Sequence, residues 1–103
     1  MHVVTNRVFV EPDWCEEFEN RFQKRAGQID KQPGFVRMQI LRPASTGAPY
    51  IVYTEWKDEQ AFNNWVGSDD FKLAHQNPMP EEAFSQKGGL EQHTLIVSAV
   101  GKG

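Results

Sequence analysis

One stretch, residues 61–76 with the sequence AFNNWVGSDDFKLAHQ, contains the side chains whose types and spacing could carry chemistry. Phe62 and Trp65 are three residues apart, so they share one face of a predicted short helix. Phe71 and His75 are four apart and share one face of a second predicted helix. Large aromatic rings suit a flat apolar ligand, and an imidazole can bind a metal ion. The alternative is that Trp65 belongs to the hydrophobic core and that His75 is structural or exposed.

The two predicted helices are separated by a joint of small and polar residues. Gly67 ends the first helix, and Ser68 is a typical N-cap for the second. Asp69 and Asp70 then fall in the first turn, where the helix dipole favours carboxylates. Such a kink can direct an indole from one helix and an imidazole from the other into the same cavity.

Asn6 interrupts a predicted strand over residues 2–10, which is otherwise rich in β-branched and aromatic residues. Asn is disfavoured in strands, so its position requires a reason. One reason is a side chain that is hydrogen-bonded at the edge of a sheet. The other is an amide donor that projects into a pocket. The strand by itself favours the first interpretation.

A helix is predicted to open at residues 12–13 and to run to about residue 30. Its apolar residues follow the spacing of an amphipathic helix: Trp14, Phe18, Phe22, Ala26 and Ile29. Arg21 and Arg25 are one turn apart and flank Phe22. Taken alone, these arginines indicate a solvated face on which Glu17 pairs with Arg21.

The remaining chain is predicted to contain three strands and one long loop. A strand over 35–41, with Phe35, Arg37, Gln39 and Leu41 on one face, is followed by a central strand over 50–56, a long loop over 76–89 and a last strand over 90–100. The order β-α-β-β-α-β predicts an α+β, ferredoxin-like fold with one antiparallel sheet and both helical segments on one face. Apolar residues alternate on both sides of the strands, so the open face needs a cover. A second copy of the chain is the simplest cover, which predicts a homodimer.

Composition narrows the class of protein. A chain of 103 residues is expected to form a single domain, 1–103. The net charge of −3 with 11 dispersed Lys and Arg residues argues against nucleic-acid binding. We expect no membrane span and no signal peptide, and the single Cys15 suits a cytoplasmic protein. His2, His75 and His93 are too scattered for a metal cluster, and phosphate-binding glycine loops and paired zinc ligands are absent from the sequence.

Several motifs together resemble a known family. They are Asn6 in the first strand, RFQKRAG at 21–27, PGF at 33–35 and EWKDEQAFNNWVGSDDFKLAHQ at 55–76. With these motifs the chain resembles the IsdG-type haem-degrading monooxygenases of the antibiotic-biosynthesis-monooxygenase superfamily, which are dimeric α+β barrels. The likeness extends over nearly the whole chain, and the spacing from Trp65 to His75 is its most specific part.

The resemblance implies roles for three residues. In that family an Asn, a Trp and a His form the active site, and they match Asn6, Trp65 and His75. The implied axial ligand to haem iron is His75. Trp65 would press on the porphyrin and ruffle it, and Asn6 would donate a hydrogen bond on the distal side.

The resemblance also implies a haem pocket around these three residues. Arg21, Phe22 and Arg25 match a motif that lines the pocket and meets the propionates in some members of the family. Phe62 and Phe71 would complete an apolar slot for the flat porphyrin. The segment 77–80, Asn-Pro-Met-Pro, does not match the family pattern.

The implied activity is oxidative opening of the haem ring with release of iron, in which haem is both substrate and cofactor. This reaction needs dioxygen and an external electron donor. One alternative is a monooxygenase that oxidises a phenolic or quinol compound without haem. The other is a haem-binding carrier or sensor without turnover.

Overall fold

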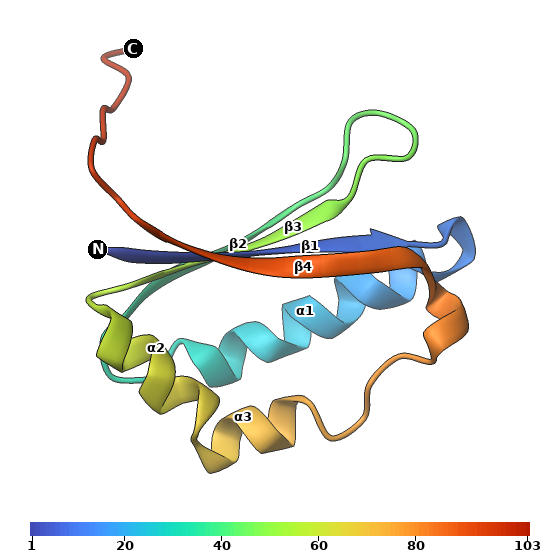
Figure 1. The fold of residues 1–103 in the computed structure, drawn as a ribbon, viewed down its shortest axis with the longest axis horizontal. Helices are drawn as coiled ribbons and strands as arrows, with labels where there is room; N and C mark the ends of the chain where they lie inside the picture. The colour runs from blue at the N-terminus through green and yellow to red at the C-terminus, as the bar shows by residue number, and fades with distance from the viewer.

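The computed structural model describes residues 1–103, except for the side chain of Ala26. The elements are β1 (His2–Val10), α1 (Cys15–Ile29), β2 (Phe35–Leu41), β3 (Tyr50–Trp56), α2 (Glu59–Val66), α3 (Asp69–Ala74) and β4 (Phe84–Thr94), with 3-10 turns at Pro12–Trp14 and Glu81–Ala83. The sheet order is β2-β3-β1-β4, and all neighbours are antiparallel. The three helices lie on one face of the sheet, and the other face carries no helix (Figure 1). The predicted α+β ferredoxin-like fold is confirmed.

The core forms where α1 and α2 meet the helical face of the sheet. Its buried members are Val4, Ile29, Trp56, Phe62 and Trp65. Trp56 is fully buried, and its indole nitrogen donates a hydrogen bond of 3.0 Å to Thr54 Oγ1, which satisfies its polar group. The predicted apolar stripe of α1 faces this layer, with Phe18 and Ile29 buried. Ala26, which was predicted to belong to the stripe, lies outside the described side chains.

The last strand was predicted wrongly at 90–100. β4 begins at Phe84, which pairs with Val10, and ends at Thr94, which pairs with His2. β4 lies at the edge of the sheet, next to β1. An edge strand tolerates polar residues, and the polar residues before Leu90 are the reason that its first half was predicted as loop. The mostly apolar residues 95–100 extend past the start of β1, and after the Leu95 amide, which donates a hydrogen bond of 3.0 Å to the Met1 carbonyl, they pair with no described strand. The loop after α3 is correspondingly shorter than predicted.

Phe35 lies on the other side of β2 from the predicted one. A bulge separates Phe35, which pairs with Trp56, from Arg37, which pairs with Glu55. The extra residue in a bulge reverses the alternation of side chains, so Phe35 turns to the helical face. There its ring packs edge-on against Trp56, with centroids 5.3 Å apart.

The open face of the sheet is more polar than predicted. Arg7 pairs with Glu91 at 3.4 Å, and Arg37 pairs with Glu55 at 3.5 Å. The Tyr53 hydroxyl also donates a hydrogen bond of 2.5 Å to Glu55, and this bond raises the pKa of Tyr53.

No helix among the described residues is long and apolar enough to cross a membrane.

Glu19 ties α1 to the loop that joins β2 and β3. Arg42 donates to it through Nε at 2.9 Å, and the Tyr50 hydroxyl donates a further hydrogen bond. These bonds, Arg42 first, lower the pKa of Glu19 from 4.5 to about 2. Because the folded pKa is depressed, this stabilisation is present above about pH 4.5 and is lost as the pH falls towards 2.

We therefore expect Glu19→Gln to lower the free energy of unfolding by about 1–2 kcal/mol at pH 7. The difference from the wild type should shrink as the pH falls below 4.5, because Glu19 of the unfolded chain then takes up a proton that the folded chain does not bind until the pH nears 2. Urea unfolding at pH 7 and near pH 2.5 would measure both values. Glu16→Gln, at an exposed carboxylate on the same helix, is the matched control and should change little. Equal losses in the two variants would contradict the role of Glu19.

Candidate functional site

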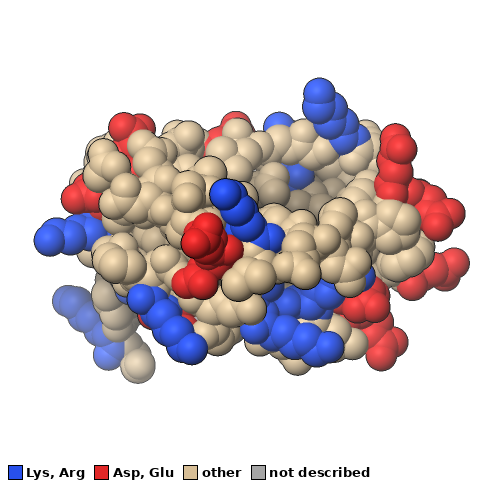
Figure 2. Space-filling view, turned by 90° about the horizontal axis from the view of Figure 1, so that it is seen from below, with Lys and Arg blue, Asp and Glu red and all other residues tan. Residues whose placement is uncertain are grey.

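A cavity of about 410 Å³ lies between the helical layer and the sheet. This volume is within the range of small-molecule and cofactor sites. The lining is mostly apolar and comes from α1, α2, α3 and all four strands: Val4, Asn6, Phe22, Arg25, Ile29, Met38, Val52, Thr54, Phe62, Asn63, Trp65, Val66, Phe71, Ala74, His75 and Leu90. Figure 2 shows the helical face hollowed, with Lys and Arg side chains bordering the hollow. Seven of the eight predicted site residues line this one cavity.

The joint between α2 and α3 is built as predicted. Gly67 is the C-cap of α2, and Ser68 is the N-cap of α3. The Ser68 hydroxyl accepts a hydrogen bond of 3.1 Å from the Phe71 amide and donates one of 2.7 Å to the Trp65 carbonyl. One side chain therefore links the end of α2 to the start of α3, and fixes the directions of Trp65 and His75 relative to each other.

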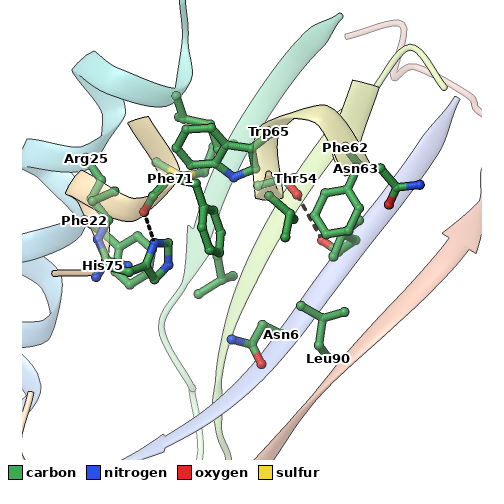
Figure 3. Close-up of a pocket in the computed structure, with 16 residues that line it drawn as sticks. Asn6, Phe22, Arg25, Thr54, Phe62, Asn63, Trp65, Phe71, His75 and Leu90 are labelled. Atoms are coloured by element: carbon green, nitrogen blue, oxygen red, sulfur yellow. Dashed lines mark hydrogen bonds between the residues drawn. The ribbon is translucent and has the colours of Figure 1, made fainter. Parts of the chain in front are cut away.

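Trp65 is both a core residue and part of the cavity wall. It is buried, and it stacks on Trp56 with centroids 6.4 Å apart. Phe71 packs edge-on against it, with centroids 5.4 Å apart. The two interpretations of Trp65 are therefore compatible, because packing on Trp56 and Phe71 holds a rigid indole at the edge of the cavity (Figure 3).

His75 is the C-cap of α3 rather than a residue of its interior. Its Nδ1 lies 2.8 Å from the Phe71 carbonyl, and its ring stacks on Phe71 with centroids 4.1 Å apart. Because a carbonyl oxygen only accepts, Nδ1 must carry the proton in this bond. In the neutral ring the lone pair is then on Nε2, which is the arrangement of a histidine prepared to bind a metal.

Asn6 lies on the sheet wall of the cavity, opposite the helices that carry Trp65 and His75 (Figure 3). β1 is an inner strand, in which Asn6 faces Val52 on one side and Leu90 on the other. The explanation by a strand edge is therefore wrong. Among the described residues the Asn6 side chain has no hydrogen-bond partner, so its amide is available to a ligand.

Arg25 borders the cavity from α1, with its guanidinium 4.7 Å from the centroid of Phe22. Burial, and then the charge of Arg21, lower the pKa of Arg25 from its usual value. No carboxylate of the described side chains lies within 4 Å of it. A partly desolvated cation without a counter-ion favours an anionic group of a ligand.

Arg21 is the predicted site residue that the structure places outside the cavity. One of its terminal nitrogens donates to the carbonyl of Asn77, and its Nε lies 3.4 Å from Glu17. The i,i+4 pair of Glu17 and Arg21 was the alternative considered for this helix, and it is present. The two arginines of the motif therefore point to different neighbours.

Several lining residues come from strands and were missed by the sequence reasoning. Val52 and Leu90 lie beside Asn6 in the sheet, and Thr54 lies two residues further along β3. Alternation along β3 predicts that Val52 and Thr54 share a face, but their position near Asn6 depends on the pairing of β1 with β3. Leu90 could not be found, because the start of β4 was misplaced. The described residues contain no group of three or more His, Cys, Asp or Glu that could hold a bare metal ion.

Comparisons with known proteins point to one family. The profile of the antibiotic biosynthesis monooxygenase family matches residues 1–77. The staphylobilin-producing haem oxygenase of Staphylococcus haemolyticus is 37% identical over 79 residues, which is 75% of each chain.

Two solved structures of similar proteins carry different chemistry. The haem degrader MhuD from Mycobacterium tuberculosis, solved with two haems in its active site, is 26% identical with a TM-score of 0.79, covering 97% of this chain and 100% of MhuD. SnoaB from Streptomyces nogalater, a cofactor-independent oxygenase solved as a mutant, is also 26% identical, with a TM-score of 0.75 and 94% coverage of both chains. Overall similarity therefore does not distinguish a haem degrader from a cofactor-independent oxygenase. The residues of the site must make that distinction.

Proposed function

Because the chain belongs to the antibiotic biosynthesis monooxygenase family, we propose that it is a haem-degrading oxygenase, with haem as both substrate and cofactor. The observation that carries this proposal is the imidazole of His75. Its Nδ1 proton is held by the Phe71 carbonyl, and the ring lies in the wall of an apolar cavity. Haem iron binds such a nitrogen. Without haem the same nitrogen would serve as a general base on a phenolic substrate, so haem binding is the property that decides between the two.

The other side chains fit the same ligand. Phe22, Phe62, Trp65 and Phe71 offer flat apolar surfaces to a porphyrin. Arg25 has no carboxylate partner among the described side chains, and it offers a guanidinium at the cavity wall to a propionate. When bound, haem supplies the iron that activates dioxygen. The protein supplies His75 as the iron ligand, an apolar slot for the porphyrin and the positive charge of Arg25 for a propionate.

Trp65 and Asn6 are proposed to direct the oxidation. Trp65 is buttressed by Trp56 and Phe71, so its indole can press on one side of a bound ring without giving way. Asn6 on the opposite wall can orient the oxygen substrate with its free amide. Ring opening with release of iron follows from attack on a carbon at the rim of the macrocycle, and it requires electrons from an external donor.

The direct test is to add haemin to the purified protein. We expect a saturable Soret band, and then its decay when ascorbate or an enzymatic reductant is added under air, with an iron chelator reporting release. Catalase must be present to exclude attack by free peroxide. A wild-type protein that binds no haem would favour the alternative, oxidation of a phenolic or quinol compound without haem. The likeness to SnoaB, a cofactor-independent oxygenase, is the observation that supports this alternative.

A homodimer is proposed from the C-terminal segment and the open face. Ile96 and Val97 are 86% and 77% exposed in the single chain, and Val100 is 88% exposed. This segment leaves the end of β4 on the side of the sheet that carries no helix (Figure 1). An extended apolar segment beside an uncovered sheet needs a partner, and a second copy can supply a symmetric one. Closure of two such sheets would give the α+β barrel implied by the resemblance.

We expect sedimentation to report a mass near twice 11.8 kDa at micromolar concentration, with or without haem. Introducing charges with Ile96→Asp and Val97→Asp should shift the protein towards the monomer, because burying two carboxylates at an apolar contact is unfavourable. Gln23→Asp with Gln28→Asp, on the exposed side of α1, adds the same charge and should leave the mass unchanged. A wild-type monomer would contradict the shared barrel.

The proposed setting is the cytoplasm. Cys15 is a free thiol, as is usual in a reducing compartment. Reduced electron donors are available there, and the reaction depends on one.

A further inference from the structure

Arg21 precedes the cavity residue Phe22, but its guanidinium contacts residues outside the cavity. One terminal nitrogen donates to the backbone carbonyl of Asn77, and Nε lies 3.4 Å from Glu17 Oε1. Only 25% of the Arg21 side chain is exposed. Its charge therefore has a counter-ion and one terminal nitrogen has an acceptor, whereas the buried Nε has no hydrogen-bond partner among the described residues. Neither Glu17 nor Asn77 belongs to the cavity. This arrangement differs from that of Arg25, one turn later, which has no carboxylate partner among the described residues.

The partner of Arg21 lies two residues after His75. His75 ends α3, a helix of only six residues, and a helix this short is marginal without tertiary contacts. The chain that follows contains Pro78 and Pro80, which have no N–H to donate to a neighbouring element. A donor that reaches this segment from α1 is therefore an important constraint on where α3 ends.

The position of the His75 imidazole depends on where the C-terminal end of α3 lies. The Nδ1 bond to the Phe71 carbonyl and the stacking on Phe71 set the ring only relative to α3. The position of α3 against α1 sets it relative to the rest of the cavity. We propose that Arg21 is a positioning residue: by holding the Asn77 carbonyl it fixes the chain after His75 against α1, and with it the direction of the imidazole. The effect of Arg21 on haem binding rests on the proposed function. The contact between Arg21 and the Asn77 carbonyl does not depend on it.

The first test uses the protein without haem. Hydrogen exchange of the amides around His75 and Asn77 should quicken roughly tenfold in Arg21→Gln, because the segment loses its anchor. Lys24→Gln removes a positive charge from the same helix beside the same segment, and should leave the exchange unchanged. Arg21→Lys keeps a charged donor and should fall between the wild type and Arg21→Gln, which also covers the case that Arg21→Gln folds poorly. Unchanged exchange in both Arg21 variants would overturn the proposal, whatever haem does.

The second test separates positioning from direct contact with haem. In the wild-type background Arg21→Gln should weaken haemin binding roughly tenfold and shift the Soret and high-spin bands towards those of His75→Ala. In the His75→Ala background the same change should have little further effect, because the group that Arg21 positions is gone. An equal loss of affinity in both backgrounds would overturn the proposal, and would show that Arg21 meets a propionate directly.

Discussion

Replacing His75 by Ala is expected to weaken haemin binding tenfold or more and to change the Soret and high-spin bands of the complex. The structure gives the physical reason. The Phe71 carbonyl holds the proton on Nδ1, so the neutral ring presents Nε2 as a ligand, and stacking on Phe71 limits its rotation. A tenfold loss corresponds to about 1.4 kcal/mol of binding free energy. Titration of haemin followed by absorbance would measure both the affinity and the spectrum.

His93→Ala is the matched control for this change. His93 lies on the open face of the sheet, where its Nε2 is 3.4 Å from Thr5 Oγ1, and it does not line the cavity. Its removal should leave the haem spectrum as in the wild type. A His75→Ala protein with an unchanged spectrum would remove the ligand assignment, even if haem still bound.

Changes at Trp65 and Asn6 should slow haem degradation much more than they weaken haem binding. A carrier needs an axial ligand and an apolar slot, but gains nothing from a distorted ring. An oxygenase must bring the attacking oxygen close to a carbon of the macrocycle, and an indole that presses on the ring shortens that distance. Contacts that matter mainly in the transition state lower the rate when they are lost, and leave the affinity nearly intact.

We expect Asn6→Ala to degrade haem roughly tenfold or more slowly, with its affinity for haemin within a few-fold of the wild type. Asn6 makes no side-chain hydrogen bond to the described residues, so its removal should not disturb the fold. Decay of the Soret band with reductant under air gives the rate, and haemin titration gives the affinity.

Trp65 needs a more careful substitution, because it is buried on Trp56 and Phe71. Trp65→Ala would leave a cavity that costs about 3–5 kcal/mol of stability. Trp65→Phe keeps a ring on Trp56 but reduces the bulk that faces the ligand, and it should also be slow in degradation. Val66→Ala, at the next residue of the cavity wall, controls for a small loss of volume. If the wild type and all variants hold haem unchanged with reductant and air, the protein is a carrier or sensor.

The local features of this protein were determined by its sequence. Side-chain spacing placed Phe62 with Trp65 and Phe71 with His75, and Ser68 caps α3 where expected. Helix faces and caps depend on residues within one turn of each other, so a short stretch contains the whole signal. β1, β2 and β3 were located for a similar reason, since alternation and β-branched residues are also local signals.

What depends on a partner far along the chain was decided only by the tertiary structure. β4 begins six residues earlier than predicted, because pairing with β1 rather than apolar content sets its limits. Phe35 changed face because a bulge against β3 shifted the alternation by one residue. The inner position of β1 made Asn6 a cavity residue and removed the strand-edge explanation.

The two arginines of α1 show the same limit at the level of single side chains. Arg21 and Arg25 are one turn apart and look equivalent in the sequence, yet Arg25 reaches the cavity and Arg21 reaches Asn77. Helical periodicity places both on one side of the helix, within a range of directions that a long flexible side chain can cover. Where each guanidinium ends is then set by the nearest acceptor, and for Arg21 that acceptor is supplied by a segment 56 residues away.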